Sequence, residues 1–237
     1  MPEDLHDFNR PMSENQSPFN ALPTVIVAIC LVMAGLELAF FAGAQGLLGG
    51  PQGILWRANT VSQYGFSPVV LESMTLRGDY SFDVIRRFVT YPFVHWTFQE
   101  AMFGTVMTLA LGKFVGDAFG NIATLILWIV TAIVGALAFG LILSGPVPLA
   151  GAFPPAYGLI GGYTYLMWLR LGEAGERQLA AFRLIGFLMA LQLVVGLFLG
   201  GAPTWIAESA AFIAGLALAP LLAPGGWQAF VARMRQR

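Results

Sequence analysis

Six long runs of apolar residues, separated by polar or glycine-containing segments, dominate the chain. A helix needs about 20 mostly apolar residues to cross the hydrocarbon core of a bilayer, and most of the runs have close to that length. The pattern therefore predicts an all-α polytopic membrane protein with six transmembrane helices. The predicted spans are residues 21–44, 92–114, 122–143, 155–169, 184–200 and 205–223.

The fourth run is shorter than the others, with about 15 residues. At 1.5 Å per residue such a helix is about 22 Å long, which is less than the hydrocarbon core of roughly 30 Å. Backbone at membrane depth must be buried in protein or line a cavity. We therefore expect the loop before residue 155 to lie in a cavity inside the bundle.

The segments outside the apolar runs differ in character. Residues 1–20 are polar and rich in proline, and they predict a disordered cytoplasmic tail. Residues 45–91 form a long first loop with aromatic residues among charges, which predicts short helices in the membrane interface. Residues 224–237 carry three arginines, which predicts a basic cytoplasmic tail against the inner leaflet. The membrane domain is thus expected over residues 21–223.

Composition agrees with a membrane protein, because 57% of the residues are hydrophobic and only 11% are charged. The mean hydropathy is +0.71, and a soluble domain has about a quarter charged residues. The net charge of -1 leaves no basic surface for nucleic acid. The single cysteine, Cys30, lies in the first apolar run, which favours a buried, inert thiol.

The basic residues predict the orientation of the helices. With the N-terminus in the cytoplasm, eight of the 12 Lys and Arg residues lie on the cytoplasmic side and four lie outside. Cytoplasmic loops carry an excess of Lys and Arg. We therefore expect both termini in the cytoplasm, which is consistent with a bacterial inner membrane.

The glycine spacing at the start of the fourth run carries the first motif. Residues 151–162 read GAFPPAYGLIGG, with Gly151, Gly158 and Gly161 in register. This spacing resembles the G-x-S-x-x-x-x-G-L-x-G signature of the rhomboid intramembrane serine proteases. The resemblance implies a nucleophilic serine at the third position, where this chain has Phe153. A phenyl ring has no oxygen with which to attack a carbonyl carbon.

A second motif precedes the second helix, where residues 87–95 read RFVTYPFVH. It resembles the rhomboid R-x-x-T-x-x-F-x-H pattern, which places Arg87 and His95 in register. Because His95 lies at the entry to the second helix, a structural role in bonding loop backbone is favoured for it. In the family a histidine and an asparagine follow, five and nine residues after the last position, and help to stabilise the oxyanion. This chain has Glu100 and Gly104 there. Both changes remove donors from the place where negative charge would develop.

A third motif lies in the sixth helix, where residues 208–215 read ESAAFIAG. It resembles the rhomboid H-x-x-G-x-x-x-G pattern, whose histidine is the general base. Glu208 stands at that position, while Ala211 and Gly215 keep the small residues that let membrane helices pack closely. The resemblance thus implies a six-helix rhomboid-like bundle in which the packing half of the motif is kept.

The two acids admit several interpretations. If Glu100 and Glu208 face one cavity near Phe153, they could share a proton as an acid pair, which raises one pKa. A cation site that includes His95 is a second interpretation, and two solvated acids with no function form the third. Since no motif supports a metal or a cofactor, we predict neither.

The resemblance favours a rhomboid-like pseudoprotease with no intact catalytic residues. Such a protein would bind transmembrane helices of other membrane proteins, and membrane lipid, without cleaving them. An active rhomboid-type serine endopeptidase with an atypical site is one alternative. A structural subunit of a larger membrane complex is the other.

Overall fold

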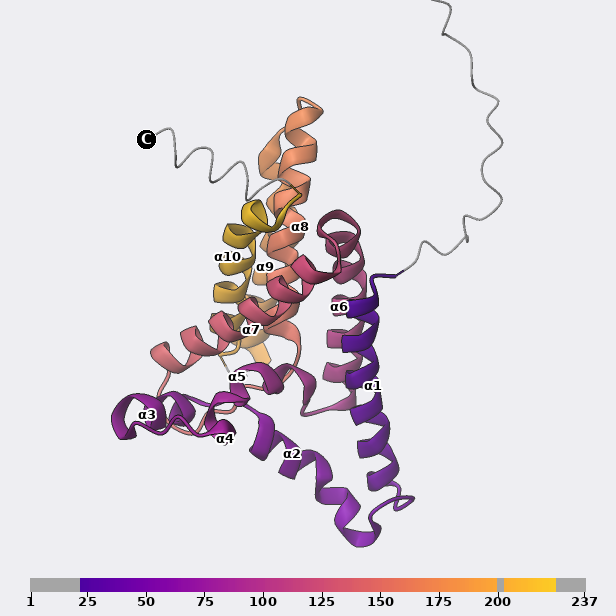
Figure 1. The fold of residues 1–237 in the computed structure, drawn as a ribbon, viewed down its shortest axis with the longest axis vertical. Helices are drawn as coiled ribbons and strands as arrows, with labels where there is room; N and C mark the ends of the chain where they lie inside the picture. Colours follow the sequence, from indigo (N-terminus) through magenta and orange to yellow (C-terminus); the bar gives the residue numbers. More distant parts are fainter. Residues whose placement is uncertain (1–21, 200–202, 225–237) are drawn as a thin grey trace, which may run out of the picture.

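The computed structural model describes residues 22–199 and 203–224 and shows a helical bundle (Figure 1). Each predicted span overlaps a long helix, so the predicted all-α polytopic fold is confirmed. The tails predicted over residues 1–20 and 224–237 lie outside the described residues, apart from Pro224. The long helices are α1 (Thr24–Ala44), α6 (Phe98–Phe119), α7 (Asn121–Ile142), α8 (Phe153–Glu173), α9 (Arg183–Leu199) and α10 (Trp205–Leu222).

Within the described residues, α1, α6, α7 and α10 are long and apolar enough to cross a membrane. The expected length of the fourth helix was wrong, because α8 has 21 residues rather than about 15. The helix continues past its apolar part into a last turn that contains Arg170 and ends at Glu173. Its N-terminal half is nonetheless buried continuously from Pro154 to Gly162, as expected for a helix that begins inside the bundle.

The first loop contains a series of short helices at one end of the bundle, in the lower part of Figure 1. Large apolar side chains on these helices are exposed, among them Leu76 and Phe82. Their position in the membrane interface stays a prediction. The short helices are η1 (Gly50–Leu55), α2 (Trp56–Tyr64), α3 (Pro68–Arg77), α4 (Phe82–Ile85), α5 (Arg87–Thr90) and η2 (Tyr91–Phe93), and η3 (Gln178–Phe182) precedes α9.

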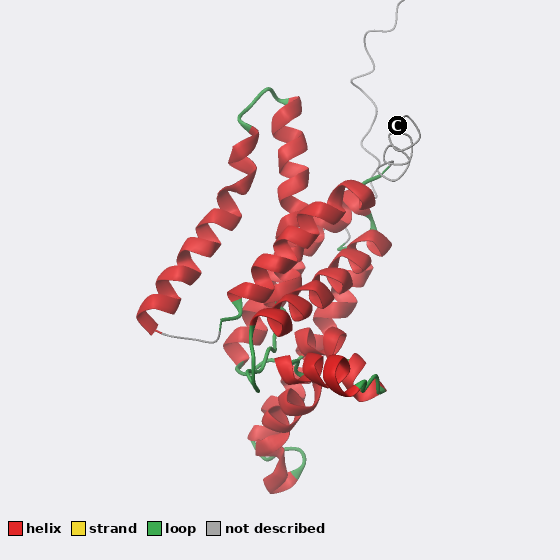
Figure 2. Cartoon of the chain, turned by 90° about the vertical axis from the view of Figure 1, so that its left-hand side faces the viewer, coloured by secondary structure: helices red, strands yellow, loops and turns green. Residues whose placement is uncertain are grey.

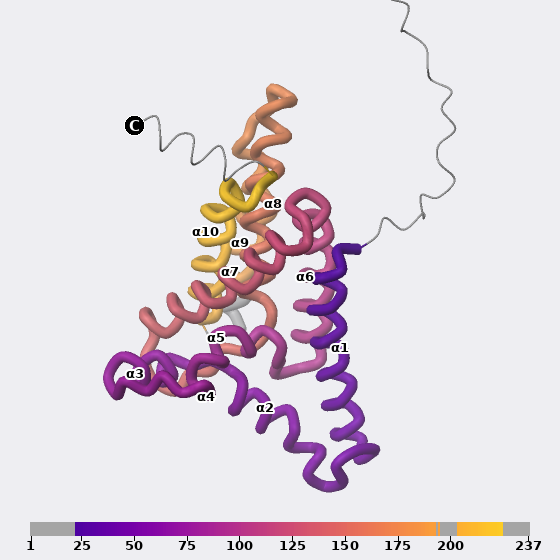
Figure 3. The backbone as a smooth tube through the Cα atoms, viewed as in Figure 1, coloured from indigo at the N-terminus to yellow at the C-terminus, as the bar shows by residue number. Residues whose placement is uncertain are grey.

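The chain path places α8 at the centre of the bundle, where it packs against α6, α7 and α10 (Figure 3). α1 packs against α6 on the outside. α1 begins and α10 ends on the side away from the first-loop helices (Figure 1). The arrangement agrees with an even number of membrane crossings.

Small residues bring α8 and α10 together, as the motif of the sixth helix predicts. A side-chain carbon built on Gly215 would overlap the backbone carbonyl of Gly158, and one on Gly161 would overlap the carbonyl oxygen of Phe212. Ala211 is fully buried in the same helix. The two helices therefore touch backbone to backbone.

Two further features define the surroundings of α8. α8 and α9 are joined by a turn and diverge away from it (Figure 2). An isolated antiparallel bridge joins the first loop to the segment before α8, because Phe66 and Leu149 exchange backbone hydrogen bonds of 2.9 and 2.7 Å. The first loop and the start of α8 are thus held in a fixed relation.

Candidate functional site

Phe153 is the first residue of α8 and is half-buried. The turn before it requires glycine, since Gly151 has a φ of +102°. The Gly151 amide donates a 3.0 Å hydrogen bond to the carbonyl oxygen of Tyr91. Two prolines follow Phe153 in the first helical turn, where a missing N–H costs nothing. The position that matches the nucleophile therefore lies at a rigid helix start.

His95 supports this helix start from the loop before α6. The backbone amide of Ala152 donates to Nε2 of His95 over 3.2 Å, and the imidazole is 1% exposed. An accepting Nε2 places the proton of the neutral ring on Nδ1. Burial, together with the positive charge of Arg57, lowers the pKa of His95 from its ordinary 6.5 to about 4. His95 is thus a neutral acceptor that fixes the amide of Ala152.

Gly104 faces this same contact from α6. A side-chain carbon built on Gly104 would lie 3.2 Å from Nε2 of His95 and 3.3 Å from the Cβ of Ala152. Both distances are tighter than ordinary van der Waals contact. A side chain at this position would therefore require His95 or Ala152 to shift by a few tenths of an ångström.

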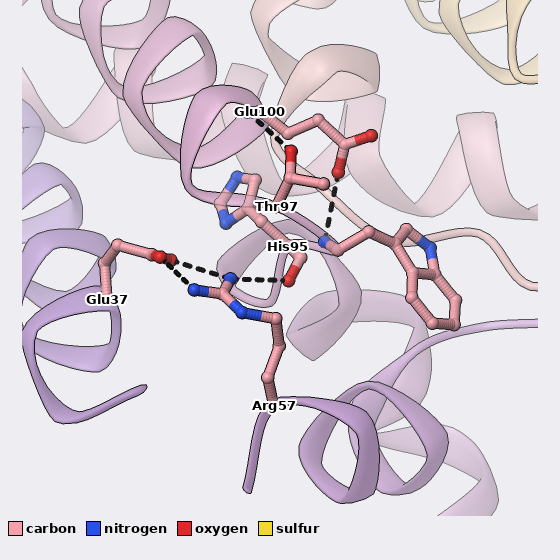
Figure 4. A network of polar contacts seen from close by, with 6 residues as sticks. Glu37, Arg57, His95, Thr97 and Glu100 are labelled. Atoms are coloured by element: carbon pink, nitrogen blue, oxygen red, sulfur yellow. Dashed lines mark hydrogen bonds and ion pairs between the residues drawn. The ribbon is translucent and has the colours of Figure 1, made fainter. Parts of the chain in front are cut away.

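A polar network that the sequence analysis missed surrounds the backbone of His95 (Figure 4). Arg57 of α2 pairs with the carboxylate of Glu37 in α1, and its Nη1 also donates to the carbonyl oxygen of His95 over 3.1 Å. Glu37 is buried in the first apolar run. A buried acid in an apolar span is itself a signal for a partner, so Glu37 could have been found from the sequence.

Glu100 has a local role at the start of α6 (Figure 4). Its backbone amide donates to Oγ1 of Thr97 over 3.1 Å, and its carboxylate accepts from the amide of Trp96 over 3.0 Å. This reciprocal pattern resembles a capping box, which satisfies two free amides of a helix start. Glu100 is partly exposed.

Glu208 has a different setting in the first turn of α10, where it is 2% exposed. The carboxamide of Gln192 in α9 donates to its Oε2 atom. The next residue, Ser209, donates to the sulfur of Met189 in α9 over 3.4 Å. A charged residue costs about 2.5–3.5 kcal/mol on insertion scales at the centre of a membrane helix. Gln192, a lone amide in an apolar run, is a second partner that the sequence analysis missed.

The hydrogen bonds of Glu100 and Glu208 thus go to different groups, an amide in the same loop and a side chain on α9. The acid pair of Glu100 and Glu208 stays a hypothesis, because no hydrogen bond between the two carboxylates is found in the described residues. Over residues 22–199 and 203–224, no group of three His, Cys, Asp or Glu side chains is placed to hold a metal ion.

The starts of α8 and α10 nevertheless meet at one point of α7. A side-chain carbon built on Gly135 would lie 3.2 Å from the Cβ of Pro154, 3.0 Å from the carbonyl oxygen of Ala207 and 3.5 Å from the hydroxyl of Tyr91. Pro154 follows Phe153, and Ala207 precedes Glu208. The fold therefore brings Pro154 and Ala207 close together, and with them the neighbouring positions of Phe153 and Glu208.

A family model described as the Rhomboid domain matches residues 83–225, more than half of the chain. The chain belongs to the rhomboid family. No curated protein matches the chain. The match spans α5 to α10, so the first helix and most of the first loop lie before it.

In this rhomboid, Arg87 and Thr90 of the second motif hold the first loop. Nη1 of Arg87 donates to the carbonyl oxygens of Ser62 and Gly65 over 2.9 and 3.1 Å. The hydroxyl of Thr90 donates to the carbonyl oxygen of Tyr64 over 2.8 Å. Carbonyls at a helix C-terminus lack partners within the helix. Arg87 and Thr90 therefore cap the end of α2.

Proposed function

We propose that this rhomboid-family protein is a pseudoprotease, which binds transmembrane segments of partner proteins without cleaving them. One observation carries the proposal: the residue that matches the nucleophilic serine is Phe153. Acyl transfer needs an activated oxygen or sulfur nucleophile at that place, and a phenyl ring supplies neither.

The surroundings of Phe153 support the proposal. The residue at the general-base position, Glu208, accepts a hydrogen bond from Gln192 on another helix. An oxyanion hole needs donors aimed at the developing charge, and Gly104 has no side chain to donate. Its neighbours, His95 and Ala152, leave little space for one.

The arrangement of α9 supports binding of a membrane segment. Side chains of α9 contact the first turn of α10 through Gln192 and Met189, while α9 diverges from α8 away from their connecting turn (Figure 2). Hydrogen bonds between membrane helices contribute about 0.6 kcal/mol each on average. An incoming helix can exchange such weak contacts for its own.

The experiment compares cleavage and binding by the full chain in proteoliposomes. A single-span rhomboid substrate carrying a photo-crosslinker is incubated with the wild type, Phe153→Ser and Phe153→Ser/Glu208→His, beside an active rhomboid. We expect crosslinked complexes and no cleavage products from any of the three. Cleavage by the wild type that Glu208→Ala abolishes would show an active peptidase built on a carboxylate. If instead the protein does not crosslink to the substrate and co-purifies with one partner protein at a fixed stoichiometry, a structural subunit would be favoured.

We further propose that both termini face the cytoplasm of a bacterial inner membrane. The excess of Lys and Arg on that side supports the orientation, as does the common side on which α1 begins and α10 ends (Figure 1). Fusions of alkaline phosphatase and of a fluorescent protein to the C-terminus test it. Phosphatase activity without fluorescence would contradict it.

A further inference from the structure

Glu208 is a buried acid whose carboxylate hydrogen-bonds to a neutral side chain in the described residues. The carboxamide of Gln192 in α9 donates to it. In the part of the chain that the structure describes, the ion pairs join other acids to cations, in Glu37–Arg57, Asp83–Arg86 and Asp117–Lys113. Neutral donors stabilise a carboxylate but leave its charge uncompensated, and an uncompensated charge in a membrane protein is costly.

A second acceptor lies beside this carboxylate. The carboxamide of Gln192 donates through Nε2 to Glu208, and its Oε1 atom is buried without a hydrogen-bond partner in the described residues. Buried polar atoms are nearly always paired, so this unpaired acceptor favours a donor group from outside the described residues. The junction of α9 and α10 therefore presents a buried carboxyl group and an unpaired acceptor together.

Two of the polar neighbours of this junction have other partners. The hydroxyl of Tyr91 donates to the carbonyl oxygen of Ala132 over 2.9 Å, and that of Ser209 donates to Met189. The group that best fits both Glu208 and Gln192 is a cation with several N–H donors. An ammonium has three donors and a guanidinium has five.

We propose that Glu208 selects partner transmembrane segments that carry a lysine or an arginine level with the first turn of α10. The proposal rests on the proposed function and specifies the chemistry of the partner. Glu208 is the fourth residue of α10, so it lies about 5 Å along the axis from the helix start. A lysine on a neighbouring helix reaches such a depth by laying its apolar stem along that helix. Pairing then compensates two intramembrane charges at once.

The test uses single-span host peptides with a leucine-rich core and one guest residue level with Glu208. The guests are lysine, glutamate and norleucine, which has an apolar chain in place of the amine. Binding of fluorescent peptides to the full chain in proteoliposomes is measured by energy transfer. For the wild type we expect the lysine peptide to bind about tenfold more tightly than the norleucine peptide, a difference of about 1.4 kcal/mol.

Variants locate the source of this preference. Glu208→Gln keeps the size of the side chain and removes the charge, so the lysine preference should disappear while norleucine binding is kept. Glu208→Lys should reverse the preference in favour of the glutamate peptide. Glu100→Gln is the matched control, because its carboxylate caps α6, and it should keep the wild-type preference.

Equal binding of the lysine and norleucine peptides to the wild type would overturn charge selection and leave the proposed function standing. This comparison needs no mutant, so it holds even if Glu208→Gln does not fold. A lysine preference that persists in folded Glu208→Gln would also overturn the proposal. If no guest peptide binds, both the selection and the proposed function fail.

Discussion

The guanidinium of Arg57 in α2 and the carboxylate of Glu37 in α1 form an ion pair inside the membrane domain. The same guanidinium donates to the carbonyl oxygen of His95 and lies over the ring of Phe40, with Cζ 5.0 Å from the centroid. Through His95, the contact extends to the amide of Ala152 at the start of α8. One arginine thus connects the first helix, the first loop and the region around Phe153.

Replacing Glu37 by leucine should destabilise the protein, because Arg57 would keep a largely buried charge without its partner. Breaking a fully buried pair costs about 3–5 kcal/mol. We expect about 1–3 kcal/mol here, since the Arg57 side chain is one quarter exposed. Denaturant unfolding in detergent micelles, followed by circular dichroism, measures the change.

Two comparisons make that prediction specific. The double variant Glu37→Leu/Arg57→Met should be more stable than Glu37→Leu alone, because neither charge remains. Asp117→Asn breaks an exposed pair with Lys113 and should cost less than about 0.5 kcal/mol. Additive losses in the double variant would contradict a direct coupling of Glu37 and Arg57.

His95 should make stability depend on pH below neutrality. Its pKa is about 4 in the folded protein and about 6.5 when unfolded, so the unfolded chain binds more protons between these values. The contribution of neutral His95 to the free energy of unfolding is complete above pH 6.5. It is lost as the pH falls to about 4, which lowers the free energy of unfolding by up to about 3 kcal/mol. Unfolding free energies at several pH values measure it.

The matched variant is His95→Gln, which keeps an acceptor for the amide of Ala152 but does not titrate. The difference in unfolding free energy between wild type and variant isolates the histidine from the carboxylates that also titrate. That difference should shift in favour of the variant as the pH falls from 6.5 to 4. A difference independent of pH would show that His95 is not held neutral.

The backbone contact of α8 and α10 should be intolerant of a single methyl group. Gly215→Ala places a carbon against the carbonyl of Gly158, and overpacking of this kind costs about 1–3 kcal/mol. Gly35→Ala is the control, because nothing lies within 4 Å of its added carbon. That change should be neutral or stabilising by up to about 1 kcal/mol, since alanine favours helix. Thermal unfolding of both variants in detergent measures the contrast.

Loss of the cap on α2 should loosen the first loop locally. Thr90→Val removes the hydroxyl that donates to Tyr64, and Arg87→Lys replaces a forked donor group by a single ammonium. Both variants should be cut faster by trypsin at the exposed Arg77 than the wild type. Thr90→Ser keeps the hydroxyl and should be cut at the wild-type rate.

Hydrophobic patterning predicted the fold well, because burial in lipid imposes the same requirement on every span. The sixth run, predicted over residues 205–223, forms α10 over Trp205–Leu222. The second run was placed too early, since α6 begins at Phe98 rather than at residue 92. An apolar run does not reveal where one helix stops and a capped helix begins. Thr97 and Glu100 mark the start of α6 as capping residues, but the apolar pattern alone does not register them.

The sequence predicts the motif positions of the candidate site but not the residues that surround them. Motif spacing predicts Phe153, Glu208 and Gly104 as site positions, because each is counted from a motif residue close to it in the sequence. The partners that give these positions their surroundings come from distant segments. Arg57 lies 38 residues before His95, and Gln192 lies 16 residues before Glu208 on another helix. Such pairings depend on the tertiary packing, which short sequence motifs do not predict.

The bridge between Phe66 and Leu149 has a consequence for biosynthesis. Leu149 follows Phe66 by 83 residues, so at about 5–20 residues per second the ribosome reaches it roughly 4–17 s later. During that interval α6 and α7 are synthesised, and the backbone groups of Phe66 lack their hydrogen-bond partner, Leu149. This bridge therefore forms only once the segment before α8 has been made, and a nascent chain stalled before residue 149 should leave the first loop more open to protease.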